Sequence, residues 1–304
     1  MTVAKKNSRL DQLHRRFEVK PGTKVRLERH DPAWAGGGEI SRKAARAIAA
    51  AEMDGDLAEL AKSQELFYAD RSRALLVIFQ ALDAAGKDGT IKHVMTGLNP
   101  QGVRVSSFKA PSNQELAHTF LWRYTGHLPE RGMIGIFNRS YYEEVLVVRV
   151  HPEYLVPQKL PAKKFNGRFW RERYEDINAY ERHLTRNGTV ILKFFLHVSK
   201  EEQRQRLLER IDNPEKHWKF NPADLGERRL WDQYGRAFEE ALTATSTKAA
   251  PWYIIPADNK WMMRALVASI LSAKLQSLKL RAPVLPEAEK AKLAEAREEL
   301  LRED

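Results

Sequence analysis

Apolar segments follow one another along the chain in an order that few folds can accommodate. Five short runs rich in β-branched and aromatic residues alternate with longer segments of helical periodicity. The runs cover residues 74–79, 103–108, 133–137, 189–196 and 252–255. The helical segments cover residues 87–96, 113–124, 140–148, 169–186, 200–211 and 225–245. This alternation predicts an α/β fold in three layers, in which helices cover both faces of a buried, five-stranded parallel sheet.

Extensions are expected on both sides of this core. The first 40 residues are predicted to form an irregular arm that lies over the core, because turn-forming dipeptides and glycines interrupt them. Further helices are expected over residues 41–70, 260–279 and 286–302. The expected parts are an arm and helix at 1–70, a core at 71–280 and a charged helix at 281–304. The last helix has few apolar residues, which indicates a surface or oligomer-contacting position.

The charge of the chain limits the ligands that it attracts. Its 304 residues carry a formal net charge of +11, so the surface should hold a positive potential that favours polyanions. Nucleic acid, acidic lipid and polyphosphate all fit, and charge alone favours nucleic acid. Because the chain has no cysteine, disulfides and thiolate metal sites are excluded. No apolar run reaches the roughly 18 to 20 residues that span a bilayer, so we expect a cytoplasmic protein without membrane contact.

The turn after the first apolar run has the composition of a phosphate-binding loop. The sequence ALLVIFQALDAAGKDGTIKHV, residues 74–94, places Gly86 and Lys87 between a predicted strand and a predicted helix. Backbone N–H groups of such a turn bind phosphate oxygens, and the lysine supplies a mobile cation. The turn departs from the GxxxxGK[ST] pattern at both ends, where Ala81 and Asp88 stand. The expected phosphate-binding residues are Ala84, Ala85, Gly86, Lys87, Asp88, Gly89, Thr90 and Lys92.

Asp83 brings a carboxylate into the turn itself. Carboxylates are good ligands for Mg²⁺, so Asp83 could hold this ion or orient an attacking phosphate oxygen. The alternative is structural: Asp83 makes an Asx-type turn, and Gly86 ends a strand. The order of strand, turn and helix favours the phosphate site.

Three segments of the chain resemble the signature segments of family-2 polyphosphate kinases. They are ALDAAGKDGTIKHV (81–94), SFKAPS (107–112) and IGIFNRSYYEEVLVVRVHPE (134–153). The third segment is similar to the subgroup that phosphorylates both nucleoside mono- and diphosphates, and the resemblance runs from about residue 67 to residue 271. It implies a thymidylate-kinase-like P-loop core with a helical lid, dependence on Mg²⁺ with Mn²⁺ as an alternative, polyphosphate as phosphoryl donor, and a homodimer or homotetramer.

The resemblance also implies nucleotide contacts where the second and third strands end. Phe108 would stack on a base and Lys109 would touch a phosphate, although core packing is the commoner fate of a strand phenylalanine. Asn138 stands where P-loop enzymes usually place a magnesium-facing aspartate, and its amide oxygen could still accept from metal-bound water. Arg139 is implied as a phosphate ligand. The implied nucleotide-binding residues are Phe108, Lys109, Asn138, Arg139, Glu143 and Arg149.

Two of these residues have structural alternatives. Ser140 and Glu143 have capping-box spacing, which favours helix initiation for Ser140 and leaves Glu143 open between a cap and the nucleotide site. Arg149 could face either a phosphate or Glu144.

Residues from about 199 to 230 occupy the place in the chain where P-loop nucleotide kinases carry their lid. The cations of this segment are Arg204, Arg206, Arg210, Lys216 and Lys219. Such cations can neutralise charge in the transition state of phosphoryl transfer. The alternative is a solvated amphipathic helix, and we expect this for Arg206. The expected catalytic residues are Asp83, Lys87, Arg139, Arg204 and Arg210.

Together these residues predict a phosphotransferase. Polyphosphate would lie along a groove formed by Lys87, Lys92, Arg204 and Arg210. Mg²⁺ at Asp83, supported by Asn138 through water, would align the terminal phosphoryl group with AMP or ADP, or with guanine nucleotides. One alternative is an ATP-dependent nucleoside monophosphate kinase, and another is a non-enzymatic P-loop protein that binds polyanions or nucleic acid. Against nucleic acid, the sequence has no aromatic and basic recognition motif.

Overall fold

The computed structural model of the protein describes residues 13–36, 41–161 and 164–303. Over these residues, the chain forms one sheet of five parallel strands in the order β2-β3-β1-β4-β5. The strands are β1 (Ala74–Ala81), β2 (Val103–Ser107), β3 (Ile134–Asn138), β4 (Thr189–His197) and β5 (Trp252–Pro256). Each strand overlaps one of the expected apolar runs, so the predicted α/β fold is confirmed.

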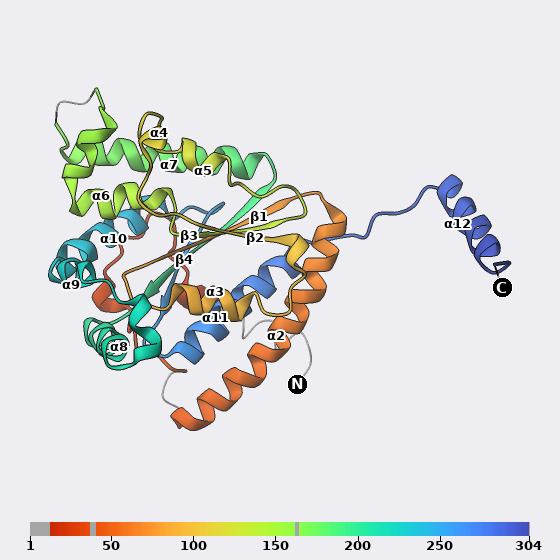
Figure 1. Cartoon of the computed structure of the whole chain (residues 1–304), viewed down its shortest axis with the longest axis horizontal. Helices are drawn as coiled ribbons and strands as arrows, with labels where there is room; N and C mark the ends of the chain where they lie inside the picture. Colours follow the sequence, from red (N-terminus) through yellow and green to blue (C-terminus); the bar gives the residue numbers. More distant parts are fainter. Residues whose placement is uncertain (1–12, 37–40, 162–163, 304) are drawn as a thin grey trace.

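Helices cover both faces of the sheet (Figure 1). Side chains alternate along β1, because successive residues of a strand point to opposite faces. Leu75 and Val77 pack in one core cluster, whereas Leu76 and Ile78 pack in the other. The first cluster is covered by α2 (Arg42–Asp70), α3 (Lys87–Val94) and α11 (Lys260–Ser277). The second is covered by α7 (Gly167–Arg186) and α10 (Trp231–Thr245).

Three of the expected helices are divided in the structure. Residues 113–124 form α4 (Asn113–Leu116) and α5 (Trp122–Thr125), and residues 140–148 form the 3-10 helix η3 (Tyr141–Val145) and α6 (Val147–Val150). Residues 225–245 form α9 (Ala223–Arg229) and α10. At Leu146 the backbone leaves the helix (φ −111°, ψ −79°) while its side chain stays in the core, so the apolar pattern does not reveal the break.

Further elements complete the described part of the chain, and some of them carry part of the site. They are η1 (Leu27–Arg29), η2 (Pro100–Gly102), η4 (Pro152–Gln158), α8 (Lys200–Asp212), η5 (Pro214–Lys219) and α12 (Glu287–Leu300). Every residue of α12 is exposed, and this helix stands away from the body of the protein in Figure 1. Among the described residues, no helix is long and apolar enough to cross a membrane.

The described part of the N-terminal arm lies on the core, as predicted. Phe17, Val19 and Val25 are buried, and the N–H of Val19 donates to the carbonyl of Trp252 at 2.8 Å. The expected arm and final helix extend further than the described residues. Their parts outside the described ranges are residues 1–12, residues 37–40 and Asp304.

Candidate active site

The turn between β1 and α3, residues 81–88 and here called the P-loop, has the backbone of a phosphate-binding loop. Ala84 (φ 61°) and Gly86 (φ 103°) lie in the left-handed region. This conformation costs a residue with a Cβ about 1 to 2 kcal/mol, so other contacts must hold Ala84. A Cβ on Gly86 would lie 3.2 Å from Met263 Cε. Because α3 begins at Lys87, its first N–H groups lack acceptors within the helix and can bind an anion.

The P-loop opens onto a cavity of about 1180 Å³, here called the catalytic cavity. It lies at the carboxyl ends of β1, β2 and β3, the edge where open α/β sheets bind ligands. Its volume exceeds that of a typical single-ligand site, about 300 to 1000 Å³, which leaves room for a donor and an acceptor. The predicted site residues that line it are Asp83, Ala84, Ala85, Gly86, Lys87, Asp88, Gly89, Phe108, Lys109, Asn138, Arg139, Glu143 and Arg210.

Arg139 joins the end of β3 to the P-loop. Its Nη2 donates to Asp83 Oδ1 at 3.0 Å, and its Nη1 donates to Glu143 Oε2 at 3.1 Å. The Glu143 carboxylate raises the pKa of Arg139, burial opposes this, and Asp83 adds to the increase. A charged guanidinium is therefore held between two carboxylates on the wall of the catalytic cavity.

Lys87 supplies a second cation beside Arg139. Its Nζ donates to the carbonyl of Ala81 at 3.4 Å. Burial lowers the pKa of Lys87 and the Arg139 guanidinium lowers it further, while three nearby carboxylates oppose the decrease. A phosphate group in the cavity would add negative charge near Nζ and would favour the ammonium form.

Asn138 contacts a P-loop residue that was not expected as its partner. Its Nδ2 donates to Asp88 Oδ1 at 2.7 Å and to Ser107 Oγ at 3.4 Å. The sequence instead suggested that Asn138 supports an ion at Asp83. No local pattern could reveal the contact with Asp88, because the two residues are 50 positions apart.

The catalytic cavity has oxygen donors of the kind that bind Mg²⁺. Asp83, Asp88 and Glu143 contribute carboxylates to its lining. Over the described residues, no group of three or more His, Cys, Asp or Glu side chains is assembled to hold a metal ion. Mg²⁺ is usually bound by one or two carboxylates, with water and substrate phosphates in the remaining positions. The donors therefore fit an ion that the protein shares with its substrate.

Arg206 contradicts the expectation of a solvated side chain. It is only 5% exposed, and its Nη1 donates to the carbonyl of Ala85 at 2.7 Å. Gln203 and Leu207 are buried on the same side of α8, which follows the i, i+3, i+4 spacing of a helix face. Leu207, next to Arg206 in the chain, is the local signal that this face of α8 is buried.

Phe108 is a core residue at the edge of the catalytic cavity. It is buried, and its ring centroid lies 4.6 Å from that of Tyr124 and 4.9 Å from that of Phe137. This packing favours the core alternative, although the residue still lines the cavity. Arg123, which the sequence did not single out, also lines the cavity and donates to the carbonyl of Lys109 at 3.0 Å.

Arg149 faces neither of the partners that the sequence left open. Its Nη2 donates to Glu240 Oε2 at 3.0 Å, and its guanidinium lies 4.7 Å from the ring centroid of Trp170. Glu144 instead accepts from Arg173 and Gln158. Side chains of α7 and α10 therefore hold Arg149.

Three more predicted site residues lie outside the lining of the catalytic cavity. Arg204 is more than half exposed and donates to Glu201 at 2.7 Å on the solvent side of α8. Lys92 is exposed on α3. The hydroxyl of Thr90 donates to the carbonyl of Gly86 at 3.0 Å, so it supports the first turn of α3.

The segment from the end of α8 to α9 contributes cations to the catalytic cavity. Arg210 donates to Asp224 Oδ2 at 3.3 Å, and Lys216 and Lys219 line the cavity beside it. Trp218, between the two lysines, is 78% exposed. Every residue of η5 and α9 is exposed or half-buried, so this segment has little packing against the core.

A buried ion pair anchors the segment that follows Arg139. Lys193 Nζ donates to Glu181 Oε2 at 2.6 Å and to the hydroxyl of Tyr142 at 2.9 Å. The hydroxyl of Tyr141 donates to Glu181 Oε1 at 2.9 Å. All four side chains are buried. The pair therefore ties η3, which carries both tyrosines, to β4 and α7.

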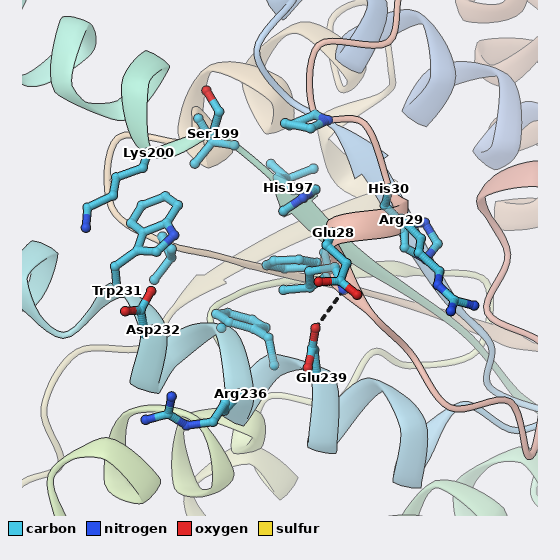
Figure 2. Close-up of a pocket in the computed structure, with 18 of the residues that line it drawn as sticks. Glu28, Arg29, His30, His197, Ser199, Lys200, Trp231, Asp232, Arg236 and Glu239 are labelled. Atoms are coloured by element: carbon cyan, nitrogen blue, oxygen red, sulfur yellow. Dashed lines mark hydrogen bonds between the residues drawn. The ribbon is translucent and has the colours of Figure 1, made fainter.

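A second cavity of about 690 Å³ lies between the N-terminal arm, the end of β4 and α10 (Figure 2). The N–H of Leu27 donates to Glu239 Oε1 at 2.7 Å along its wall. Burial lowers the pKa of His197 to about 4, and nearby His30 adds to the decrease. The charged side chains of its lining are Arg29, Lys200, Arg236, Glu28, Asp31, Asp232 and Glu239. Since these include more carboxylates than cations, this cavity is a poor site for a phosphate chain.

Proteins with similar sequences and structures share one class of activity in their names. A family model described as "Polyphosphate kinase 2 (PPK2)" matches residues 43–283. An ADP-polyphosphate phosphotransferase from Rhodopseudomonas palustris is 53% identical over 244 residues, which cover 80% of this chain and 84% of that protein. An AMP/ADP-polyphosphate phosphotransferase from Meiothermus ruber is 48% identical over 270 residues, covering 88% and 95%. The crystal structure of polyphosphate kinase 2 from Arthrobacter aurescens TC1 is similar with a TM-score of 0.81 and 38% identity, covering 92% of this chain and 95% of that one.

Proposed function

Because the chain belongs to the polyphosphate kinase 2 family, we propose that it transfers the terminal phosphoryl group of inorganic polyphosphate to AMP and ADP, in a reversible reaction. The observation that carries this proposal is a single cavity that joins the P-loop, Arg139 and the cations that follow α8. Relatives named for ADP and for AMP and ADP support both acceptors.

The P-loop side of the catalytic cavity would hold the end of the polyphosphate chain. N–H groups at the start of α3 and the Lys87 ammonium can bind oxygens of the terminal phosphates. Arg210, Lys216 and Lys219 can neutralise the phosphates that follow. The net charge of +11 is then explained by a polyanionic substrate, and no nucleic-acid partner is needed.

The ends of β2 and β3 would hold the nucleotide. Lys109, Arg123 and Asn138 line this part of the cavity and present donors to a nucleotide phosphate or to the base. Phe108 would contact the base with the edge that faces the cavity. Most of the Phe108 ring is packed in the core, so its contact with the base would be small, and we propose that adenine and guanine nucleotides are both accepted.

The chemistry is a direct phosphoryl transfer. An oxygen of the nucleotide's terminal phosphate forms a bond to the terminal phosphorus of polyphosphate, and the bond to the next phosphate breaks with its electron pair on the shortened chain. Arg139 and Lys87 neutralise the charge on the transferred group and the leaving oxygen, and Asp83 orients Arg139. Mg²⁺ bound at Asp83 would supply further charge neutralisation. Positioning and charge suffice, so no covalent enzyme intermediate is required.

The test is ATP formation by the purified protein from polyphosphate, Mg²⁺ and either AMP or ADP. Asp83→Asn and Lys87→Ala should each lower the rate at least about 100-fold, since each removes a charge next to the transferred group. Lys290→Ala on the exposed α12 is the matched control and should leave the rate unchanged. Phosphorylation of AMP by ATP without any transfer from polyphosphate would instead support an ordinary nucleotide kinase.

The remaining expectations are part of the same proposal. They are use of Mn²⁺ in place of Mg²⁺, a homodimer or homotetramer, and a cytoplasmic location. Release of bound nucleic acid by polyphosphate at equal charge concentration would identify any such binding as a general effect of charge.

A further inference from the structure

We propose that α8 is a fixed scaffold of the P-loop, in which Gln203 and Arg206 act as positioning residues that hold three successive backbone carbonyls away from the catalytic cavity. This inference deepens the proposed phosphotransferase function and rests on it. It divides the expected lid, residues about 199–230, into a fixed first helix and a closing segment that begins near Asn213.

The contacts reach the P-loop from one face of α8. Gln203 Nε2 donates to the carbonyl of Asp83 at 3.0 Å. Arg206 Nη1 donates to the next two carbonyls, those of Ala84 at 3.1 Å and Ala85 at 2.7 Å. The backbone oxygens of residues 83–85 therefore point at α8, away from the space where phosphate oxygens would be repelled by them.

The remaining donors of Arg206 are also bonded within the protein. Its Nη2 donates to the carbonyls of Ala257 at 2.6 Å and Asp258 at 3.1 Å, and its Nε donates to Glu202 Oε1 at 2.7 Å. A guanidinium has five N–H donors, and these contacts together with the two P-loop carbonyls provide five acceptors. Arg206 therefore acts on the substrate through the P-loop and the end of β5, because no donor is left for a phosphate oxygen.

The conformation of the P-loop explains why such contacts are needed. Ala84 has φ of 61°, a conformation that its own side chain disfavours. Two charge-assisted hydrogen bonds to the carbonyls of Ala84 and Ala85 stabilise this conformation before any ligand binds. Gln203 holds the backbone carbonyl of Asp83. The Asp83 side chain is thereby directed towards Arg139.

A contact at its start and the burial of one face distinguish α8 from the segment that follows it. The N–H of Ser199 donates to Asp258 Oδ1 at 2.8 Å, so the start of α8 is fixed to the end of β5. Arg228 on α9 donates to Gln203 Oε1 at 2.9 Å, so the same glutamine also contacts the end of the closing segment. Gln203, Arg206 and Leu207 are buried, whereas every residue of η5 and α9 is exposed or half-buried.

The decisive variant is Gln203→Met, which keeps the length of the side chain and removes both the donor to Asp83 and the acceptor of Arg228. Gln205→Met is the matched control, because Gln205 is exposed two positions further along the same helix. In Gln203→Met we expect kcat for polyphosphate-dependent ATP formation to fall about tenfold, as for a lost buried hydrogen bond in an active site. KM should stay within about threefold and the thermal midpoint within about 6 °C, since folding loses two hydrogen bonds, the one to Asp83 and the one from Arg228.

Amide hydrogen exchange of residues 82–89 gives a readout that does not need activity. These amides should exchange at least about tenfold faster in Gln203→Met than in Gln205→Met. Wild-type kcat together with wild-type exchange in Gln203→Met would overturn the proposal. If the wild-type protein forms no ATP from polyphosphate, the proposed function fails and hydrogen exchange alone decides the role of α8.

Arg206→Lys is the second variant, because it keeps the charge with three donors in place of five. We expect it to lower kcat more than Gln203→Met and to speed exchange over the same residues. Unchanged exchange in a folded Arg206→Lys protein would contradict the scaffold role of Arg206. If this variant does not fold, Gln203→Met and its control still decide the outcome.

Discussion

The side-chain amide of Asn138 donates a 2.7 Å hydrogen bond to the carboxylate of Asp88. These two residues are places where the chain departs from the usual P-loop pattern. Asp88 stands in place of the serine or threonine of the loop, and Asn138 stands in place of the aspartate after the third strand. The usual pair is an uncharged hydroxyl in the loop and a carboxylate after the third strand. In this chain the carboxylate is in the loop and the uncharged polar group follows the third strand.

Exchange of the two side chains should restore what a single change disrupts. Asn138→Asp places two carboxylates at hydrogen-bond distance, and we expect kcat/KM for polyphosphate-dependent ATP formation to fall at least about tenfold from their repulsion. Addition of Asp88→Asn returns one carboxylate and one amide, and should bring kcat/KM back to within about threefold of wild type. Steady-state kinetics of the two single variants and the double variant test this. Simple additivity of their losses would contradict the coupling.

The two arginines of α8 that were predicted to be catalytic should differ in their effects. Arg210 lines the catalytic cavity, so Arg210→Gln should lower kcat/KM for polyphosphate at least about tenfold. Arg204 pairs with Glu201 on the solvent side, so Arg204→Gln should change it less than about twofold. The measurement is initial rate against polyphosphate concentration. Equal losses in the two variants would show that Arg204 reaches the substrate in a state other than this structure.

Loss of the Lys193 charge should destabilise the fold strongly. Lys193→Met leaves the buried Glu181 carboxylate without its cation, which should lower the free energy of unfolding by about 3 to 5 kcal/mol. Lys62→Met breaks an exposed pair with Glu59 and should cost less than about 1 kcal/mol. Urea unfolding measures both. Addition of Glu181→Gln to Lys193→Met should recover part of the loss, and a further decrease would show that the unpaired charge is not the cause.

A fall in pH should lower the free energy of unfolding in part through protonation of His197. Burial lowers the pKa of this side chain to about 4, nearby His30 adds to the decrease, and Asp258 and Asp31 oppose it. The unfolded chain takes up this proton near pH 6.5, so the folded state binds fewer protons between the two values. The contribution of neutral His197 is therefore complete above pH 6.5 and is lost as the pH falls towards 4.

The variant His197→Gln isolates this effect. The free energy of unfolding of the wild type should fall relative to that of His197→Gln by up to roughly 1.4 kcal/mol per pH unit below pH 6.5. Urea unfolding of both proteins across this range gives the difference. Parallel curves of free energy against pH would exclude His197 as the titrating group.

Features that depend on neighbouring residues could be predicted. The strand and helix periods predicted the five-stranded parallel sheet, because burial on both faces makes the inner strands β1, β3 and β4 mostly apolar. The phosphate-binding turn with Asp83, Gly86 and Lys87 could be predicted because these residues lie close together in the chain. Arg139 was found because it directly follows a strand, and parallel strands bring their carboxyl ends to one edge.

Contacts between distant segments could not be predicted from the sequence. Arg204 and Arg206 carry the same charge and lie two positions apart on α8, so they point about 200° apart around the helix. Arg206 donates a hydrogen bond to the carbonyl of Ala85, which lies 121 positions earlier in the chain, whereas Arg204 faces solvent. The residues of this chain dictate that a charged helix follows β4 and that a phosphate-binding turn follows β1. Packing of α8 on the core settles which arginine reaches that turn, because burial selects one helix face and charge alone cannot.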